Sequence, residues 1–191
     1  MDLICRLAAR FVDMFVVGFF CIGLALVIVQ TTFLMLNPVW SGAPDLYFVL
    51  VAYLAYRHDL LRSLIILFPL AMIFDVLSGL VLGMYPALFL LGFFVLKFLS
   101  DRLPVRESLY QLPMIGVVYL LVNWVVYICI SLAAPDLLVP WSWPVMLMRA
   151  VLVALFAFPL FRFFDFFSRS IERGFSGLHR PRLRGGNRYR E

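Results

Sequence analysis

Few side chains in this 191-residue chain are of the types that carry catalysis or bind metal ions. The two histidines, His58 and His179, are expected in a turn and in the C-terminal tail, without an acid or cysteine cluster to complete a metal site. The three cysteines, Cys5, Cys21 and Cys129, lack the spacing of metal ligands. Ser78, which precedes Gly79, lacks a nearby base, and no glycine-rich nucleotide loop is present. The sequence therefore predicts a protein that is not an enzyme and needs no cofactor or metal ion.

One acidic residue, Asp75, lies deep within an apolar stretch, between Leu70 and Gly79. A charge at the middle of a bilayer costs about 2.5–3.5 kcal/mol on insertion scales, so Asp75 is expected to face other helices and to have a partner. Arg149 has a similar expected depth, and we predict that these two side chains approach one another. Three alternatives stay open: Arg149 extends to the membrane interface, Arg149 pairs with Asp45, or Asp75 relays protons.

A few other polar or small residues interrupt the apolar stretches. Gln30 and the two threonines after it cluster near the end of the first stretch, and Asn123 lies in the middle of another. Interhelical hydrogen bonds are their expected role, and a ligand pocket is the alternative. Gly79 and Gly83 are four residues apart, a spacing that predicts close contact with another helix.

The composition is that of an integral membrane protein. Apolar and aromatic residues make up 64% of the chain and charged residues 14%, with a mean hydropathy of +1.01. Soluble domains typically have about 45–50% apolar and about 25% charged residues. The net charge of +5 resides in residues 168–191, which hold seven arginines against two glutamates, while residues 1–167 are neutral. So few charges cannot cover a soluble surface, and we expect no binding to nucleic acid.

Six apolar stretches predict six transmembrane helices, at roughly residues 12–36, 45–56, 61–82, 85–100, 109–133 and 144–167. With this assignment, fifteen of the sixteen lysines and arginines lie on one side, and Arg149 is the exception. A five-span arrangement would spread these charges over both sides. Because basic residues favour the cytoplasm, both termini are predicted to be cytoplasmic, with Tyr85 and Trp143 among the aromatic residues at the outer interface. The predicted fold class is an all-α polytopic membrane protein, a six-transmembrane-helix bundle.

Two short regions flank the transmembrane domain of residues 12–167. Residues 1–11 separate charged from apolar side chains on opposite faces of a helix, which predicts an amphipathic segment at the interface; an unstructured start is the alternative. Residues 168–191 are expected to form a flexible, arginine-rich cytoplasmic tail. Each arginine near an anionic leaflet contributes about 1 kcal/mol, so the tail is expected to bind anionic lipids. Docking to a cytoplasmic protein is the alternative.

Three short patterns follow one another along the chain: Gln30-Thr31-Thr32, then Pro44-Asp45-Leu46 at the start of the second span, then Asp75, Gly79 and Gly83 at intervals of four. In order and spacing, over roughly residues 24–100, they resemble the MreD family, small membrane proteins of the bacterial rod-shape machinery. The resemblance implies a non-enzymatic scaffold in the bacterial cytoplasmic (inner) membrane. It would bind MreC and, through it, MreB, RodA and a penicillin-binding transpeptidase, and so direct lateral peptidoglycan synthesis.

The short external connections affect where such a partner could bind. They leave no room for a folded domain outside the membrane, so we expect the MreC transmembrane helix and its adjoining segment to dock on the outer-leaflet half. Asp45, Asp75 and Arg149 would shape that region as structural residues.

MreD proteins also resemble, in fold, the substrate-binding S-components of energy-coupling-factor transporters. A binder of a vitamin or another small solute is therefore the alternative function, with Asp75, Asn123 and Gln30 as the candidate polar lining. S-components usually carry an Ala-x-x-x-Ala contact motif in the first span, and residues 12–36 lack it.

Overall fold

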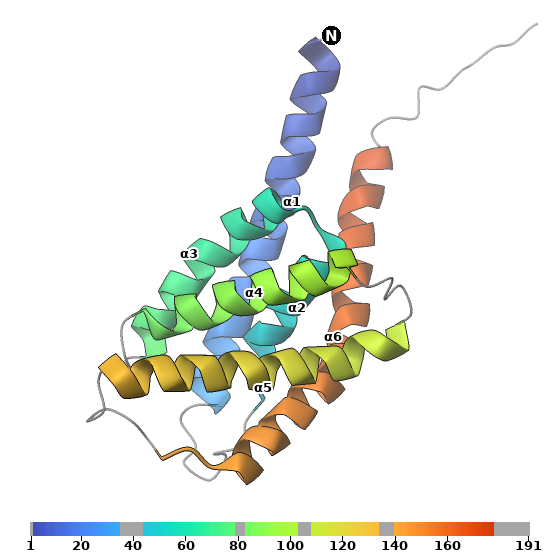
Figure 1. Cartoon of the computed structure of the whole chain (residues 1–191). Coiled ribbons are helices and arrows are strands. Elements are labelled where there is room, and N and C mark those ends of the chain that lie inside the picture. The colour runs from blue at the N-terminus through green and yellow to red at the C-terminus, as the bar shows by residue number, and fades with distance from the viewer. Residues whose placement is uncertain (1, 35–43, 79–82, 103–107, 134–139, 178–191) are drawn as a thin grey trace, which may run out of the picture.

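The computed structural model is helical in every element that it describes (Figure 1). It describes residues 2–34, 44–78, 83–102, 108–133 and 140–177. The elements are α1 (Asp2–Val29), a π-helical continuation η1 (Gln30–Leu34), α2 (Leu46–Arg57), α3 (Leu60–Ser78), α4 (Met84–Arg102), α5 (Ser108–Ala133) and α6 (Trp143–Gly177). The predicted all-α class is thereby confirmed.

Five of these helices, α1, α3, α4, α5 and α6, are long and apolar enough to cross a membrane. Helix α2, which corresponds to the second expected span, is apolar but has 12 residues. At 1.5 Å per residue it is about 18 Å long, whereas the hydrocarbon core of a typical bilayer is about 30 Å thick. The described part of the chain therefore contains five candidate spans and one shorter apolar helix.

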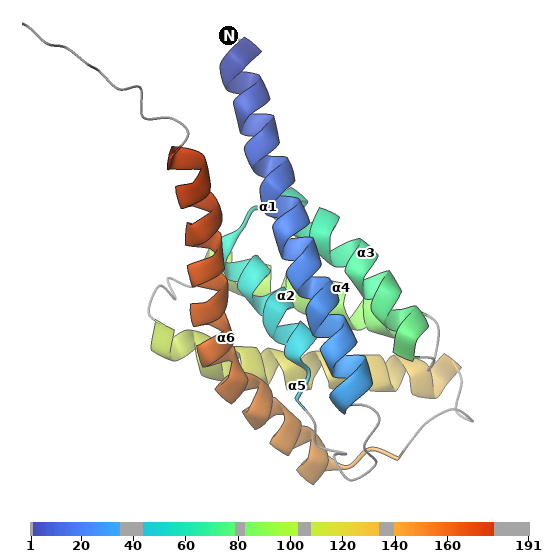
Figure 2. The same ribbon diagram turned by 180° about the vertical axis from the view of Figure 1, so that it is seen from behind.

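Helix α2 lies at the centre of the bundle and contacts all five longer helices (Figures 1 and 2). Its nine residues from Tyr47 to Ala55 are at most 1% exposed. The sequence explains this position, because valine, leucine, alanine, phenylalanine and tyrosine occupy every side of the helix, and a helix that is hydrophobic all round is buried. The large apolar side chains exposed on α3, α5 and α6 form the outer surface instead.

Glycines permit the closest approaches between helices. A Cβ atom at Gly92 of α4 would lie 2.6 Å from Cε2 of Phe48, whose ring is fully buried in α2. At Gly116 of α5, a Cβ atom would lie 3.2 Å from the carbonyl oxygen of Ala150 in α6. Small residues thus bring helix backbones together, as is common in membrane proteins.

The predicted helix contact through Gly79 and Gly83 is wrong for Gly83. Helix α3 ends at Ser78, before the predicted end of the third span, and Gly83 lies in the turn that precedes α4. Its φ of +89° is a conformation that favours glycine, and no atom lies within 4 Å of a Cβ placed on it. Gly83 therefore permits a turn rather than a close contact, and Gly79 lies outside the described residues.

The start of α1 and the end of α6 project beyond the other helices at the same end of the molecule (Figures 1 and 2). Helix α1 is continuous from Asp2, so residues 2–11 are its first turns. Helix α6 continues to Gly177, so the expectation of a flexible tail from residue 168 is wrong for residues 168–177. The reason is packing: a Cβ atom at Gly18 of α1 would lie 3.0 Å from Ile171 and 3.2 Å from Phe167. Residues 178–191 lie outside the described residues.

Replacing Gly92 by valine is expected to lower the free energy of unfolding by about 1–3 kcal/mol, because the buried Phe48 ring must shift to admit the new side chain. Ala87→Val on the exposed side of the same helix is the control and should unfold like the unmodified protein. Unfolding of purified protein in mixed detergent micelles measures both. Equal stability of the two variants would contradict the close α2–α4 contact.

Candidate functional site

A polar cluster joins the end of α1 to the start of α2. Gln30, which opens η1 and is 2% exposed, donates from Nε2 to Oδ1 of Asp45 at 2.6 Å. The backbone N–H of Tyr47 donates to Oε1 of Gln30 at 3.0 Å. Amides in the first turn of a helix have no acceptor within that helix, and the Asp45 side chain makes no capping bond here. Gln30 supplies the missing acceptor and so makes the interhelical contact expected of it.

Asp45 also interacts with α5 and α6. The hydroxyl of Tyr119, a fully buried residue of α5, donates to Oδ2 of Asp45. The positive charge of Arg149 in α6 stabilises the Asp45 carboxylate. Side chains from η1 and α5 therefore meet at this carboxylate, and Arg149 of α6 lies near enough for its charge to act on it, while direct pairing of Arg149 with Asp45 stays a prediction.

Asp75, which is 4% exposed, holds the start of α4. Its Oδ2 accepts the N–H of Gly83 at 2.6 Å, and its Oδ1 accepts the N–H of Tyr85 at 3.3 Å. A carboxylate at the N-terminus of a helix is also favoured by the helix dipole. The charges of Asp45, Asp75 and Arg149 all act on the Tyr85 hydroxyl, so the three lie within electrostatic range of it. Direct pairing of Asp75 with Arg149 stays a prediction.

We call Gln30, Asp45, Asp75, Tyr85, Tyr119 and Arg149 the outer cluster, after the side of the membrane on which the sequence predicts them. The candidate residues predicted from the sequence are placed as follows: Gln30, Asp45, Asp75 and Arg149 belong to the cluster, Pro44 is buried beside Asp45, Gly83 binds Asp75, and Gly79 lies outside the described residues.

Two expectations from the sequence are corrected. Asn123 donates to the carbonyl of Tyr119 in its own helix at 2.8 Å, rather than to a neighbouring helix. Thr31 likewise donates to the carbonyl of Val27. Tyr85, which was expected at the outer interface, is 9% exposed and packs on Phe74, with ring centroids 4.5 Å apart.

Tyr119 and Tyr85 are the members of the cluster that were not among the candidate residues predicted from the sequence. A signal was available, because a buried tyrosine hydroxyl within an apolar helix usually needs a hydrogen-bond partner. The sequence does not say which acid supplies it, since Asp45 and Tyr119 are 74 residues apart.

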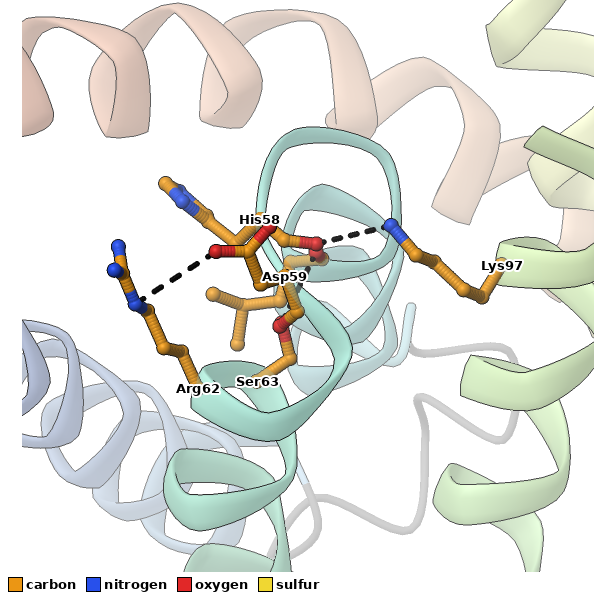
Figure 3. Close-up of polar contacts among 6 residues, drawn as sticks. His58, Asp59, Arg62, Ser63 and Lys97 are labelled. Atoms are coloured by element: carbon orange, nitrogen blue, oxygen red, sulfur yellow. Dashed lines mark hydrogen bonds and ion pairs between the residues drawn. The ribbon is translucent and has the colours of Figure 1, made fainter. Parts of the chain in front are cut away.

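A second polar group, the inner cluster, lies at the other end of α2. Arg57 Nη2 lies 3.2 Å from Oδ2 of Asp165 in α6, and the Tyr53 hydroxyl donates to Oδ1 of Asp165 at 3.1 Å. Lys97 Nζ of α4 donates to the His58 carbonyl oxygen at 3.0 Å (Figure 3). This cluster joins α2, α4 and α6, and the sequence analysis did not identify Asp165 or Tyr53.

His58 lies in the turn between α2 and α3 within this cluster. Its ring packs against Phe15, Phe19 and Tyr53, with centroids 4.5, 5.6 and 5.7 Å away. Burial, together with the nearby charge of Arg62, lowers the pKa of His58 to about 4, so the imidazole is neutral at pH 7. Its Nε2 is buried without a hydrogen-bond partner among the described atoms.

Among the described residues, no group of three or more histidine, cysteine, aspartate or glutamate side chains could hold a metal ion. The contacts observed in the outer cluster are hydrogen bonds and electrostatic interactions between charged groups. Comparison of the chain with protein-family models, with curated proteins and with solved structures found no match.

Gln30→Leu is expected to lower the free energy of unfolding by about 1–3 kcal/mol, because it leaves the Tyr47 amide without an acceptor and removes a donor from Asp45. Thr31→Val, which removes a hydroxyl bonded within its own helix, is the control and should have a smaller effect. Unfolding in detergent measures both changes. Equal stability of the two variants would contradict a structural role of the outer cluster.

His58→Phe is expected to reduce the loss of stability on acidification. The folded-state pKa of about 4 lies below the ordinary value of 6.5, so protonation favours the unfolded chain. The contribution is complete above pH 6.5 and is lost as the pH falls toward 4. Unfolding temperatures should therefore fall more between pH 7 and pH 5 in the unmodified protein than in His58→Phe, which retains an aromatic ring but cannot titrate. Parallel curves for the two proteins would contradict the assignment.

Proposed function

We propose that this chain is a non-enzymatic membrane scaffold of the MreD type, which binds MreC and helps to position lateral peptidoglycan synthesis in a rod-shaped bacterium. The observation that carries the proposal is the outer cluster. Gln30, Asp45, Asp75 and Gly83, which carry the resemblance to the MreD family, lie up to 53 positions apart and are linked by hydrogen bonds and charges around the starts of α2 and α4.

The hydrogen bonds of this cluster favour a structural role over a solute-binding one. The Asp45 carboxylate accepts from Gln30 and Tyr119, and the Asp75 carboxylate accepts from two backbone amides of the α4 start. The polar side chains that a solute would need are thus engaged within the chain. They connect helices, which supports a scaffold rather than an S-component of a transporter.

The proposed arrangement has six transmembrane segments, with α2 as a short segment enclosed by the others and both termini in the cytoplasm. The position of the α1 start and the α6 end on the same side of the molecule supports this arrangement (Figures 1 and 2). The distribution of basic residues supports the cytoplasmic assignment. The arginines after residue 168 would then face anionic lipids of the inner leaflet.

The proposed MreC contact lies on the outer-leaflet half, around the helices that the outer cluster holds in place. MreC would bind directly, and MreB, RodA and the penicillin-binding transpeptidase would associate through the complex. Because Asp75 fixes the start of α4, a change at Asp75 should alter the surface offered to MreC without removing any residue from it.

Depletion of the protein in its native cell tests the proposal. Rounding and swelling of the cells is the expected result, because lateral wall synthesis would lose its position. Normal rods with a defect in the uptake of a vitamin or another small solute would refute the scaffold and favour the transporter component.

A variant tests the role of the outer cluster in this function. Asp75→Leu should reduce the MreC that co-purifies from membranes, whereas Asp101→Leu, at the exposed inner end of α4, should not. The two variants are compared at equal amounts of protein in the membrane. Equal recovery of MreC with the Asp75→Leu and Asp101→Leu variants would mean that the outer cluster does not contribute to MreC binding.

A further inference from the structure

The C-terminal half of α6 carries two exposed arginines on one face of the helix. Arg162 and Arg169 are seven residues apart, which is close to two full turns. Their side chains therefore leave the helix in nearly the same direction, about 10 Å apart along its axis. Phe166 lies between them and is 69% exposed. The two positive charges thus belong to one stripe of α6 that faces away from the bundle.

In the part of the chain that the structure describes, neither of these arginines has an ion pair. Asp165 lies between them in the sequence, but its two oxygens bind the Tyr53 hydroxyl and the Arg57 guanidinium. The guanidinium carbon of Arg162 lies 5.3 Å from the centre of the Phe158 ring, a contact with the face of the ring that uses none of its N–H donors. Both arginines therefore keep their charge and their donors for a ligand outside the chain.

The two arginines lie where α6 leaves the hydrocarbon core. Residues 150–161 contain no charged side chain, and Arg162 is then followed by Asp165 and Arg169. Charged side chains are costly within the core, and long cationic ones extend to its edge. Asp165 is paired with Arg57, whose side chain is 53% exposed, so the inner cluster lies at the same level. This level is where the phosphate groups of the adjacent lipids are found.

The chemistry of this stripe fits an anionic phospholipid. A guanidinium group can donate two parallel hydrogen bonds to the oxygens of a phosphate, and both arginines are placed to do so. The exposed rings of Phe158 and Phe166 offer apolar surface to the acyl chains. A zwitterionic headgroup carries a cation of its own, which the two arginines repel, so a headgroup with net negative charge is favoured.

We propose that the face of α6 formed by Phe158, Arg162, Phe166 and Arg169 binds the phosphate of an anionic phospholipid in the adjacent leaflet. These four residues are called the α6 lipid site. The site belongs to a helix that packs on the bundle, so it is distinct from any lipid contact of residues 178–191. It requires that α6 crosses the membrane and does not depend on the proposed function.

Native mass spectrometry of the protein with bound lipid tests the site. The full chain is purified in detergent with equal amounts of phosphatidylglycerol and phosphatidylcholine, and the ratio of the two bound lipids is measured. To exclude binding by the tail, a background variant carries glutamine at five positions: Arg180, Arg182, Arg184, Arg188 and Arg190. In this background, Arg162→Gln and Arg169→Gln should each lower the preference for phosphatidylglycerol about fivefold, and the double variant roughly thirtyfold, which is the usual effect of one and of two arginines near anionic lipid.

Arg62→Gln in the same background is the matched control. The Arg62 side chain is 43% exposed at the same end of the molecule but is already paired with Asp59 at 3.7 Å, so its loss should leave the lipid preference nearly unchanged. Two results would overturn the proposal. Equal losses with Arg62→Gln and Arg162→Gln would mean a general attraction to positive charge without a site. An unchanged preference in the double variant would mean that the two arginines face another occupant, such as an acidic protein segment.

Discussion

The carboxylate of Asp45 is the group on which the arrangement of the outer half depends. It is approached by Gln30 from α1, by Tyr119 from α5 and by the charge of Arg149 from α6, and it stands at the start of the buried helix α2. A carboxyl group in apolar surroundings is costly to leave without hydrogen-bond donors or a positive charge beside it. The positions of four helices therefore follow from one side chain that is costly to leave unpartnered.

Helix α2 transmits this constraint through the bundle. Because it has apolar residues on every side, it can be surrounded by other helices without a polar seam, and the side chains that fix its position gather at its two ends. The outer end is held by Gln30 and Tyr119 through Asp45, and the inner end by Asp165 through Tyr53 and Arg57. Apolar packing therefore surrounds the middle of α2, and the hydrogen bonds at its two ends fix its position along the neighbouring helices.

Much of this fold follows from hydropathy alone, because burial in lipid and burial in protein both select apolar stretches of helical length. The approximate positions of the helices, including the short α2, were predictable for that reason. The end of α3 was not predictable from hydropathy. The turn at Gly83 depends on a left-handed backbone conformation and on the carboxylate of Asp75, eight residues earlier. The helical extension to Gly177 was not predictable either, because it depends on contacts of Phe167 and Ile171 with Gly18.

The candidate site was predictable as a set of residues but not as a set of contacts. Gln30, Asp75 and Arg149 were identified because polar groups in apolar segments are costly, a property of local sequence. Their partners come from distant segments, and a tyrosine such as Tyr119 resembles the other aromatic residues of its helix until the fold brings it to Asp45. The choice between pairing Arg149 with Asp75 or with Asp45 likewise depends on helix rotation, which hydropathy does not determine.

The shortness of α2 also bears on how the chain enters a membrane. Eleven apolar residues followed by Arg57 are too few to be recognised and inserted as an independent transmembrane helix. Two residues, His58 and Asp59, connect α2 to the longer and strongly apolar α3. In the proposed arrangement of six segments, α2 and α3 are expected to insert together as a hairpin, with α2 enclosed once α4, α5 and α6 have been synthesised. During that interval the Asp45 carboxylate lacks Tyr119 and Arg149, so the last two helices complete the polar cluster as well as the bundle.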